Sequence, residues 1–134
     1  IHRIAIIQEL KNKLEPFEAN RIIRLRGKLK QDILELQSST SLNENRLEEE
    51  LIYYLEKMDI NEEKVRLTAH CSYFIEISED NSMEKGKKLG FIAQEIGREI
   101  NTIGSKANDA AMQKIVVQMK DELEKIKEQL MNVL

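Results

Sequence analysis

Two glutamates one helical turn apart, Glu95 and Glu99, form the most chemically capable arrangement in this sequence. Lys88 and Lys106 bracket them along one flank of an expected helix, and Arg98 lies beside them. Carboxylates at this spacing can act as ligands of a hard divalent ion, and the neighbouring cations can bind phosphate. The alternative is that the glutamates only form salt bridges with these cations, which is the commoner use of such a spacing.

A helix over residues 82–109 must position these groups. At about 100° of turn per residue, its apolar side chains share one side, which predicts a core face. That core face consists of Leu89, Ile92, Ile96, Ile100, Ile103 and Ala107. The opposite side consists of Lys87, Gln94, Arg98, Asn101 and Ser105, with Thr102 on the flank of the glutamates. A further stripe consists of Gly86, Gly90, Gly97 and Gly104, whose missing Cβ atoms allow a neighbouring helix or a phosphate to approach closely.

The other apolar spacings predict an all-α protein, with long antiparallel helices in a hairpin or bundle. Helices are expected over residues 1–14, 17–37, 47–58, 62–78 and 112–133, with Pro16 in the first turn of the second helix. Asn61 and Asp109 are expected to cap the helices that follow them. In the last helix the apolar spacing alternates between four and three, which is typical of a coiled-coil seam packing within the chain or between subunits. The seam consists of Met112, Val116, Met119, Leu123, Ile126, Leu130 and Val133.

The composition suits one soluble helical domain, since the 134 residues are 34% charged and only 4% aromatic. The formal net charge of −3 argues against a uniformly basic nucleic-acid binder, yet residues 21–30 carry five cations and no acid. Arg21, Arg24 and Lys28 line one shoulder of that helix, either facing solvent or contacting nucleic acid. A single cysteine, Cys71, and the lack of a membrane-length apolar run lead us to expect a cytoplasmic protein with no membrane partner.

Residues 86–109 read GKKLGFIAQEIGREINTIGSKAND. This segment resembles the signature of the YicC family, whose C-terminal region carries G-(R/K)-(R/K)-L-x-F-x-x-Q-E-x-x-R-E-x-N-T-x-x-S-K. Upstream, LEEELIYYLEKMDINEEKVRLTAH resembles the family segment D-(I/V)-x-E-E-x-x-R-L-x-x-H, and the resemblance continues through KIVVQMKDELEKIKEQLMNVL. It covers roughly residue 44 to the end, and more loosely the first helix. Gly90 stands where the family leads us to expect Asp, and Gly97 where it leads us to expect Asn.

The resemblance implies an endoribonuclease that hydrolyses single-stranded RNA with the help of Mn²⁺ or Mg²⁺. On that basis Glu95 and Glu99 become candidate metal ligands, and His70 becomes a candidate acid or base if its helix packs nearby. The candidate catalytic residues are Glu95, Glu99, Arg98, His70 and Lys106. The candidate RNA-binding or phosphate-binding residues are Lys87, Lys88, Gln94, Asn101, Thr102, Ser105, Arg21, Arg24 and Lys28.

The resemblance also implies a further N-terminal domain and a hexameric ring. We therefore expect residues 1–37 to form a helical arm leading from that domain, and residues 38–134 to form a C-terminal helical domain. Two other functions stay open at this point. One is a helical oligomerisation module, which the coiled-coil spacing and the glycine stripe favour, and the other is RNA binding without cleavage.

Overall fold

The structure is a computed structural model that describes residues 2–36, 44–80, 83–107 and 109–133. These residues form α-helices and no strand, so the all-α prediction is confirmed. The helices are α1 (His2–Asn12), α2 (Leu14–Leu36), α3 (Glu44–Met58), α4 (Asn61–Ser78), α5 (Lys85–Lys106) and α6 (Ala110–Val133).

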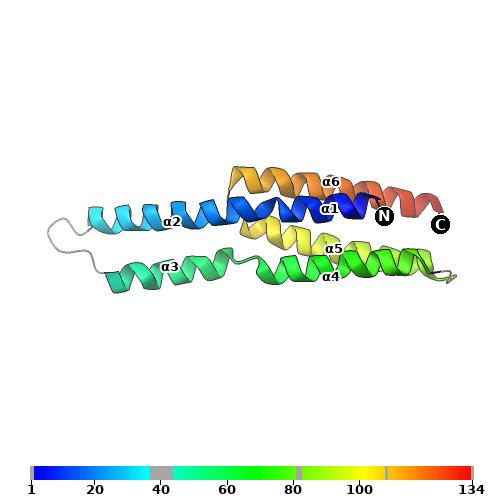
Figure 1. Ribbon diagram of the computed structural model, residues 1–134, viewed down its shortest axis with the longest axis horizontal. Helices are drawn as coiled ribbons and strands as arrows, with labels where there is room; N and C mark the ends of the chain where they lie inside the picture. The colour runs from blue at the N-terminus through cyan, green and yellow to red at the C-terminus, as the bar shows by residue number, and fades with distance from the viewer. Residues whose placement is uncertain (1, 37–43, 81–82, 108, 134) are drawn as a thin grey trace.

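Helices α1, α4, α5 and α6 pack together as a four-helix bundle (Figure 1). Helix α3 and most of α2 project from one end of this bundle as a two-helix arm, and the two chain ends lie at the opposite end of the molecule. A short connection joins α4 to α5, which run antiparallel and pack along their length. The expected antiparallel bundle is therefore present, with an arm attached to it.

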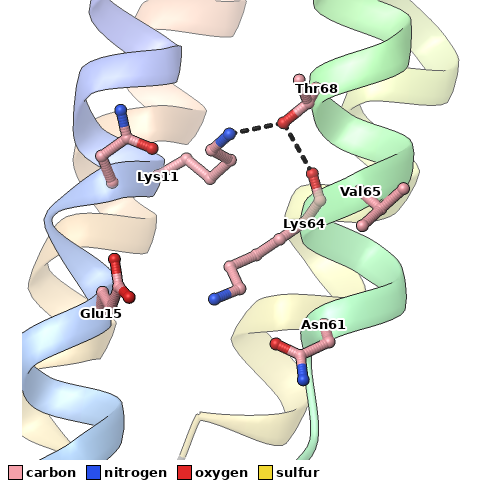
Figure 2. A pocket seen from close by; sticks show the side chains of 7 residues that line it. Lys11, Glu15, Asn61, Lys64, Val65 and Thr68 are labelled. Atoms are coloured by element: carbon pink, nitrogen blue, oxygen red, sulfur yellow. Dashed lines mark hydrogen bonds between the residues drawn. The ribbon is translucent and has the colours of Figure 1, made fainter.

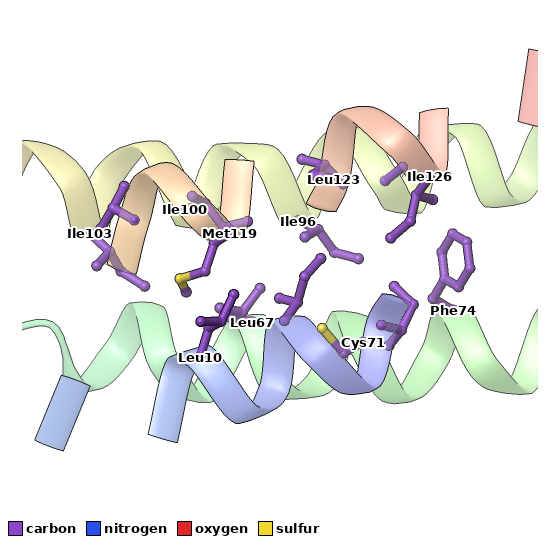
Figure 3. Packing of buried hydrophobic residues seen from close by; sticks show 14 of the residues in the cluster. Leu10, Leu67, Cys71, Phe74, Ile96, Ile100, Ile103, Met119, Leu123 and Ile126 are labelled. Carbon is purple, nitrogen blue, oxygen red and sulfur yellow. The ribbon is translucent and has the colours of Figure 1, made fainter. Parts of the chain in front are cut away.

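The hydrophobic core lies between the bundle helices and confirms the core face predicted within residues 82–109. All six predicted residues of that face are buried. Figure 3 shows Ile96 and Ile100 of α5 in the same layer as Met119 of α6. Each apolar side chain of this size contributes about 1.5–3 kcal/mol when it leaves water. This packing fixes the rotation of α5 about its axis, and with it the direction of the polar side chains.

The apolar seam of the last helix packs within the chain. Met112, Val116, Met119, Leu123 and Ile126 are buried in the bundle core, and Leu130 is partly buried against it, whereas the side chain of Val133 lies outside the described part. Of the two expected uses of the seam, the structure shows the one within the chain. The homo-oligomer stays a prediction, and these residues do not require it.

The predicted helix starts are right in two cases and wrong in one. Pro16 is the third residue of α2, where it lacks only an N–H that has no partner within the helix. Asp109 caps α6, since its Oδ1 accepts a 2.7 Å hydrogen bond from the Ala111 N–H. Asn61 is not a cap, because it is the first residue of α4 and its own N–H donates to Asp59 Oδ1 at 2.9 Å. The Asp59 side chain therefore accepts a hydrogen bond from the first N–H of α4, which is not one of the N–H groups that an Asn61 cap would satisfy.

Two glycines of the predicted stripe allow α5 to approach α6 closely. A Cβ atom built on Gly97 would lie 3.1 Å from Leu123 Cδ2, and one on Gly104 would lie 3.1 Å from Val116 Cγ1. Gly90 has open space around the same position. At Gly97 and Gly104 the close neighbour is thus a helix of the same chain.

The predicted domain boundary at residue 38 lies outside the described residues, between α2 and α3. Ile4, Ile7 and Leu10 of α1 are buried in the same core as the other bundle helices. The division into an arm over residues 1–37 and a separate domain stays a prediction. Every described helix is too short or too polar to cross a lipid bilayer.

Candidate functional site

The polar side of α5 faces solvent along the length of the helix. Its exposed side chains are Lys87, Lys88, Gln94, Arg98, Asn101 and Ser105. The hydroxyl groups of two candidates are used within the helix, because Thr102 donates to the Arg98 carbonyl at 3.1 Å and Ser105 to the Thr102 carbonyl at 2.9 Å. We call this exposed side the outer face of α5. Its remaining polar groups, on Lys87, Lys88, Gln94, Arg98 and Asn101, are available to a ligand.

Glu95 and Glu99 lie in different surroundings although they are one turn apart. The Glu95 side chain is 45% exposed, and its Oε2 lies 3.9 Å from Nη1 of Arg98, whose side chain is 74% exposed. The Glu99 side chain is only 7% exposed and points toward α4. An incoming ligand can therefore reach the carboxylate of Glu95 but not that of Glu99.

Arg66 of α4 is the partner of Glu99, and it is not among the site residues predicted from the sequence. Its Nε donates to Glu99 Oε1 at 3.1 Å, and its Nη1 donates to Glu62 one turn earlier in α4. These hydrogen bonds to Glu99 and Glu62 raise the pKa of the Arg66 guanidinium. The signal that could have found it was present, since Glu62, Arg66 and His70 follow one another at one-turn intervals.

Lys106 likewise contacts the α4 side of the bundle. Its Nζ donates to Glu63 Oε1 at 2.7 Å and to the Asp59 carbonyl oxygen at 3.2 Å. Burial raises the pKa of the Glu63 carboxyl, but the hydrogen bond from Lys106 and the nearby positive charges outweigh burial, so this pKa lies below its ordinary value. Lys106 therefore joins α5 to α4, with a buried carboxylate as its partner.

The contacts between α4 and α5 also place His70. Residue 66 pairs with residue 99 and residue 63 with residue 106, so the two helices run antiparallel in this register. Extended one turn beyond Arg66, these two pairs place the half-buried His70 at about the level of residues 95–99. The expectation that the helix of His70 packs against α5 is confirmed, while the role of His70 stays a prediction.

A divalent ion fits this region only partly. Glu63 Oε2 and Glu99 Oε2 are buried and accept no hydrogen bond from any described residue, but Lys106 and Arg66 hold the other oxygen of each carboxylate. Among the described residues there is no group of three or more acidic, histidine or cysteine side chains arranged to hold a metal. Mg²⁺ can bind through one or two carboxylates when substrate phosphates and water supply the other ligands. Of the two predicted ligands, only Glu95 is open enough for this role.

The three basic residues predicted on α2 differ in their surroundings. Arg21 is buried, donating from Nη1 to the Lys106 carbonyl at 3.1 Å and from Nη2 to the Met58 carbonyl at 2.7 Å. Burial lowers the pKa of Arg21, against the raising effect of nearby carboxylates. Arg24 pairs with Asp109, and its side chain is 65% exposed. Lys28 is exposed and forms no ion pair with any residue that the structure describes.

A cavity of about 410 Å³ lies elsewhere, between α1, the start of α2 and α4 (Figure 2). Within it the Lys11 ammonium donates to the Thr68 hydroxyl, which itself donates to the Lys64 carbonyl at 2.9 Å. Lys64 Nζ pairs with Glu18 at 2.8 Å. None of the candidate residues from the sequence lines this cavity, so the predicted chemistry does not depend on it.

Comparison with known proteins identifies the family of this chain. Residues 14–134 match the family described as "Endoribonuclease YicC-like, C-terminal". The match covers most of the chain, and the protein therefore belongs to the YicC-like family. Within that family, the chain corresponds to the C-terminal region.

Two relatives, each named "Probable endoribonuclease YicC", are similar to this chain. The relative from Clostridioides difficile (strain 630) is 41% identical over 129 residues, which cover 92% of this chain and 43% of the relative. The relative from Haemophilus influenzae (strain ATCC 51907 / DSM 11121 / KW20 / Rd) is 33% identical over 93 residues, which cover 69% of this chain and 32% of the relative. The chain thus spans less than half the length of these relatives.

Proposed function

We propose that this chain is the C-terminal helical part of an endoribonuclease that hydrolyses phosphodiester bonds of single-stranded RNA. The observation that carries the proposal is the family match over residues 14–134, in a chain whose relatives are named as endoribonucleases. The open outer face of α5 supports it, because this face carries the polar residues of the family signature. An RNA substrate and a single buried thiol also suit a cytoplasmic protein.

In this proposal the outer face of α5 contacts RNA through Lys87, Lys88, Gln94, Arg98 and Asn101. Arg98 is suited to stabilise charge that develops on a phosphate, since its exposed guanidinium has only a distant contact with Glu95. His70 would exchange a proton with the attacking or the leaving oxygen. Lys106, Thr102 and Ser105 contribute less directly, because the structure gives their polar groups partners within the chain.

The proposal includes a divalent ion, which Glu95 would hold. When bound, Mn²⁺ or Mg²⁺ polarises a phosphate oxygen and helps to generate the attacking hydroxide. Glu95 would hold the ion together with RNA phosphate and water, and Glu99 could join only after release from Arg66. Without an ion this region has little attraction for phosphate, because Glu62, Glu63, Glu95 and Glu99 offset the charges of Arg66, Arg98 and Lys106.

A helical oligomerisation module is the second candidate, and the surface of the arm favours it. Large apolar side chains are exposed on both helices of the arm, namely Ile22 and Ile23 of α2 and Ile52, Tyr53 and Tyr54 of α3. Clustered exposed apolar side chains are common at protein interfaces. A homo-oligomer, with the hexamer suggested by the family resemblance, is compatible with both functions.

The test uses the full-length protein that contains this chain. It is incubated with end-labelled single-stranded RNA and either Mn²⁺ or EDTA, and the products are separated on a denaturing gel, with assembly followed by light scattering. We expect internal cleavage with Mn²⁺ and none with EDTA. An oligomer that leaves the RNA intact under both conditions would instead support the second candidate.

A further inference from the structure

A cavity of about 360 Å³ lies where the arm joins the bundle. It is lined by Arg21, Arg24, Leu25, Lys28, Met58 and Asp109. Three of these side chains are cationic and one is a carboxylate, so the lining is positively charged overall. This contrasts with the contacts between α4 and α5, where acids and bases balance.

Arg21 is the buried cation of this lining, and it holds three helices together. Its guanidinium, carried by α2, donates to the last carbonyls of α3 and α5, at Met58 and Lys106. A cation at these carbonyl ends is favourable because the ends of both helix dipoles are negative there. The Arg21 Nε is buried and has no hydrogen-bond partner among the described residues. Arg21 therefore keeps a positive charge and one unused donor.

Arg24 and Lys28 lie one turn apart on α2, line the same cavity and remain available to a ligand. Arg24 uses one nitrogen for Asp109, which leaves most of its N–H donors unused. Lys28 is exposed and has no ion pair within the described residues. Asp109 also caps α6, so its carboxylate is shared between the start of that helix and Arg24.

We propose that this cavity binds a phosphate group of the RNA backbone, with Arg24 and Lys28 as its direct contacts and Arg21 as the residue that positions them. The site rests on the proposed RNA substrate and adds an anchoring point away from the cleaved bond. Arg98 lies about 12 Å along α5 from Lys106, whose carbonyl accepts a hydrogen bond from Arg21 of the cavity. The outer face of α5 and this cavity are therefore within reach of one RNA strand. Asp109 competes with the phosphate for Arg24, which keeps the affinity moderate.

The test measures binding separately from cleavage. The full-length protein is titrated with a fluorescein-labelled, 2′-O-methylated single-stranded RNA in EDTA, and anisotropy is followed at several salt concentrations. The variants are Arg24→Gln/Lys28→Gln, Asp109→Asn and, as a matched control, Lys30→Gln, which removes an exposed cation of the same helix outside the cavity. Thermal unfolding of the wild type with inorganic phosphate tests whether the cavity prefers the free anion.

We expect the double variant to bind RNA about 5- to 10-fold more weakly, with the salt slope reduced by about 0.7 for each lost phosphate contact. Lys30→Gln should stay within about twofold of the wild type, and Asp109→Asn should bind more tightly because Arg24 is released. Equal weakening by Lys30→Gln and the double variant would overturn the proposal. The proposal would also be overturned if the double variant bound RNA as tightly as the wild type. This holds even if inorganic phosphate stabilises the wild type, because the cavity would then bind the free anion and not RNA. Since the titration contains no metal, a protein that binds RNA through this cavity but never cleaves it would refute only the nuclease proposal.

Discussion

Arg66 of α4 donates from Nε to Oε1 of Glu99 on α5 across 3.1 Å, and the carboxylate that it meets is almost wholly buried. The contact joins the two helices that carry the family signature segments. It also separates the two glutamates that the sequence paired, since Glu99 belongs to this internal contact and Glu95 to the surface. The buried pair of Arg66 and Glu99 thus holds α5 against α4, while the exposed groups of the outer face of α5 stay separate from this contact.

Removing Arg66 should destabilise the protein because it leaves a buried carboxylate unpaired. Arg66→Gln is expected to lower the melting temperature, and the double variant Arg66→Gln/Glu99→Gln should recover part of the loss. Thermal unfolding followed by circular dichroism measures both. The matched control is a second double-mutant cycle, with Arg3→Gln, Glu122→Gln and both together. It probes the ion pair that joins α1 to α6 at 3.0 Å. If the losses from Arg66→Gln and Glu99→Gln simply add, the two residues do not support each other.

The glycines of α5 should respond differently to alanine. Gly90→Ala is expected to stabilise the protein by about 1 kcal/mol, because alanine favours the helix and its Cβ meets open space. Gly97→Ala and Gly104→Ala should gain less or lose stability, since their Cβ atoms crowd Leu123 and Val116 at 3.1 Å. Urea unfolding of the three variants gives the comparison. An equal gain at all three positions would show that α5 does not approach α6 this closely.

Stability should fall in acid through Glu63 and Asp109. Burial raises the pKa of Asp109, but hydrogen bonds from the Ala111 N–H and from Arg24 outweigh it, so the pKa of both carboxyls is lowered on folding. A lowered pKa contributes stability that is fully present above the ordinary carboxyl pKa of about 4 and is lost as the pH falls through the folded value. Urea unfolding between pH 7 and pH 3 should therefore show a loss below about pH 4.

Glu63→Gln and Asp109→Asn are the variants that check this assignment. Each should be less stable than the wild type at pH 7 and should lose less on acidification, since one linked carboxyl is absent. A wild-type stability that stays constant down to pH 3 would contradict the lowered pKa values. So would a pH dependence that neither substitution reduces.

Periodicity was enough to predict the parts of the fold that depend on local pattern. Ile92, Ile96 and Ile100 recur at the helical period, so the buried side of α5 was evident from the sequence. Pro16 and Asp109 carry local chemistry that suits a helix start, and the structure places both there. The one-turn spacing of Arg66 and His70 could have marked Arg66 as a site residue, but its pairing with Glu99 depends on the register between α4 and α5, which no local pattern gives.

The arm shows a second limit of pattern. Leu47, Leu51 and Met58 of α3 have the spacing of a core helix and are buried, yet none of them belongs to the bundle core. An apolar stripe predicts that something covers it but does not identify the covering element. In the same way, the basic spacing of Arg21 and Arg24 gave no sign that Arg21 would be buried against two helix ends. Their roles are separated only by the tertiary structure, which brings the ends of α3 and α5 to Arg21.

The most direct test of the account is the rate at which full-length Glu95→Gln cleaves single-stranded RNA in Mn²⁺, compared with the wild type and Glu128→Gln. Glu128 is an exposed glutamate of α6 outside the proposed site, so its substitution controls for the loss of one surface charge. We predict that Glu95→Gln lowers kcat by about 100-fold or more because the metal ion loses its protein ligand, that its RNA affinity in EDTA is no weaker than that of the wild type, and that Glu128→Gln matches the wild type. Full cleavage by Glu95→Gln would contradict the proposed role of Glu95 in holding the metal ion.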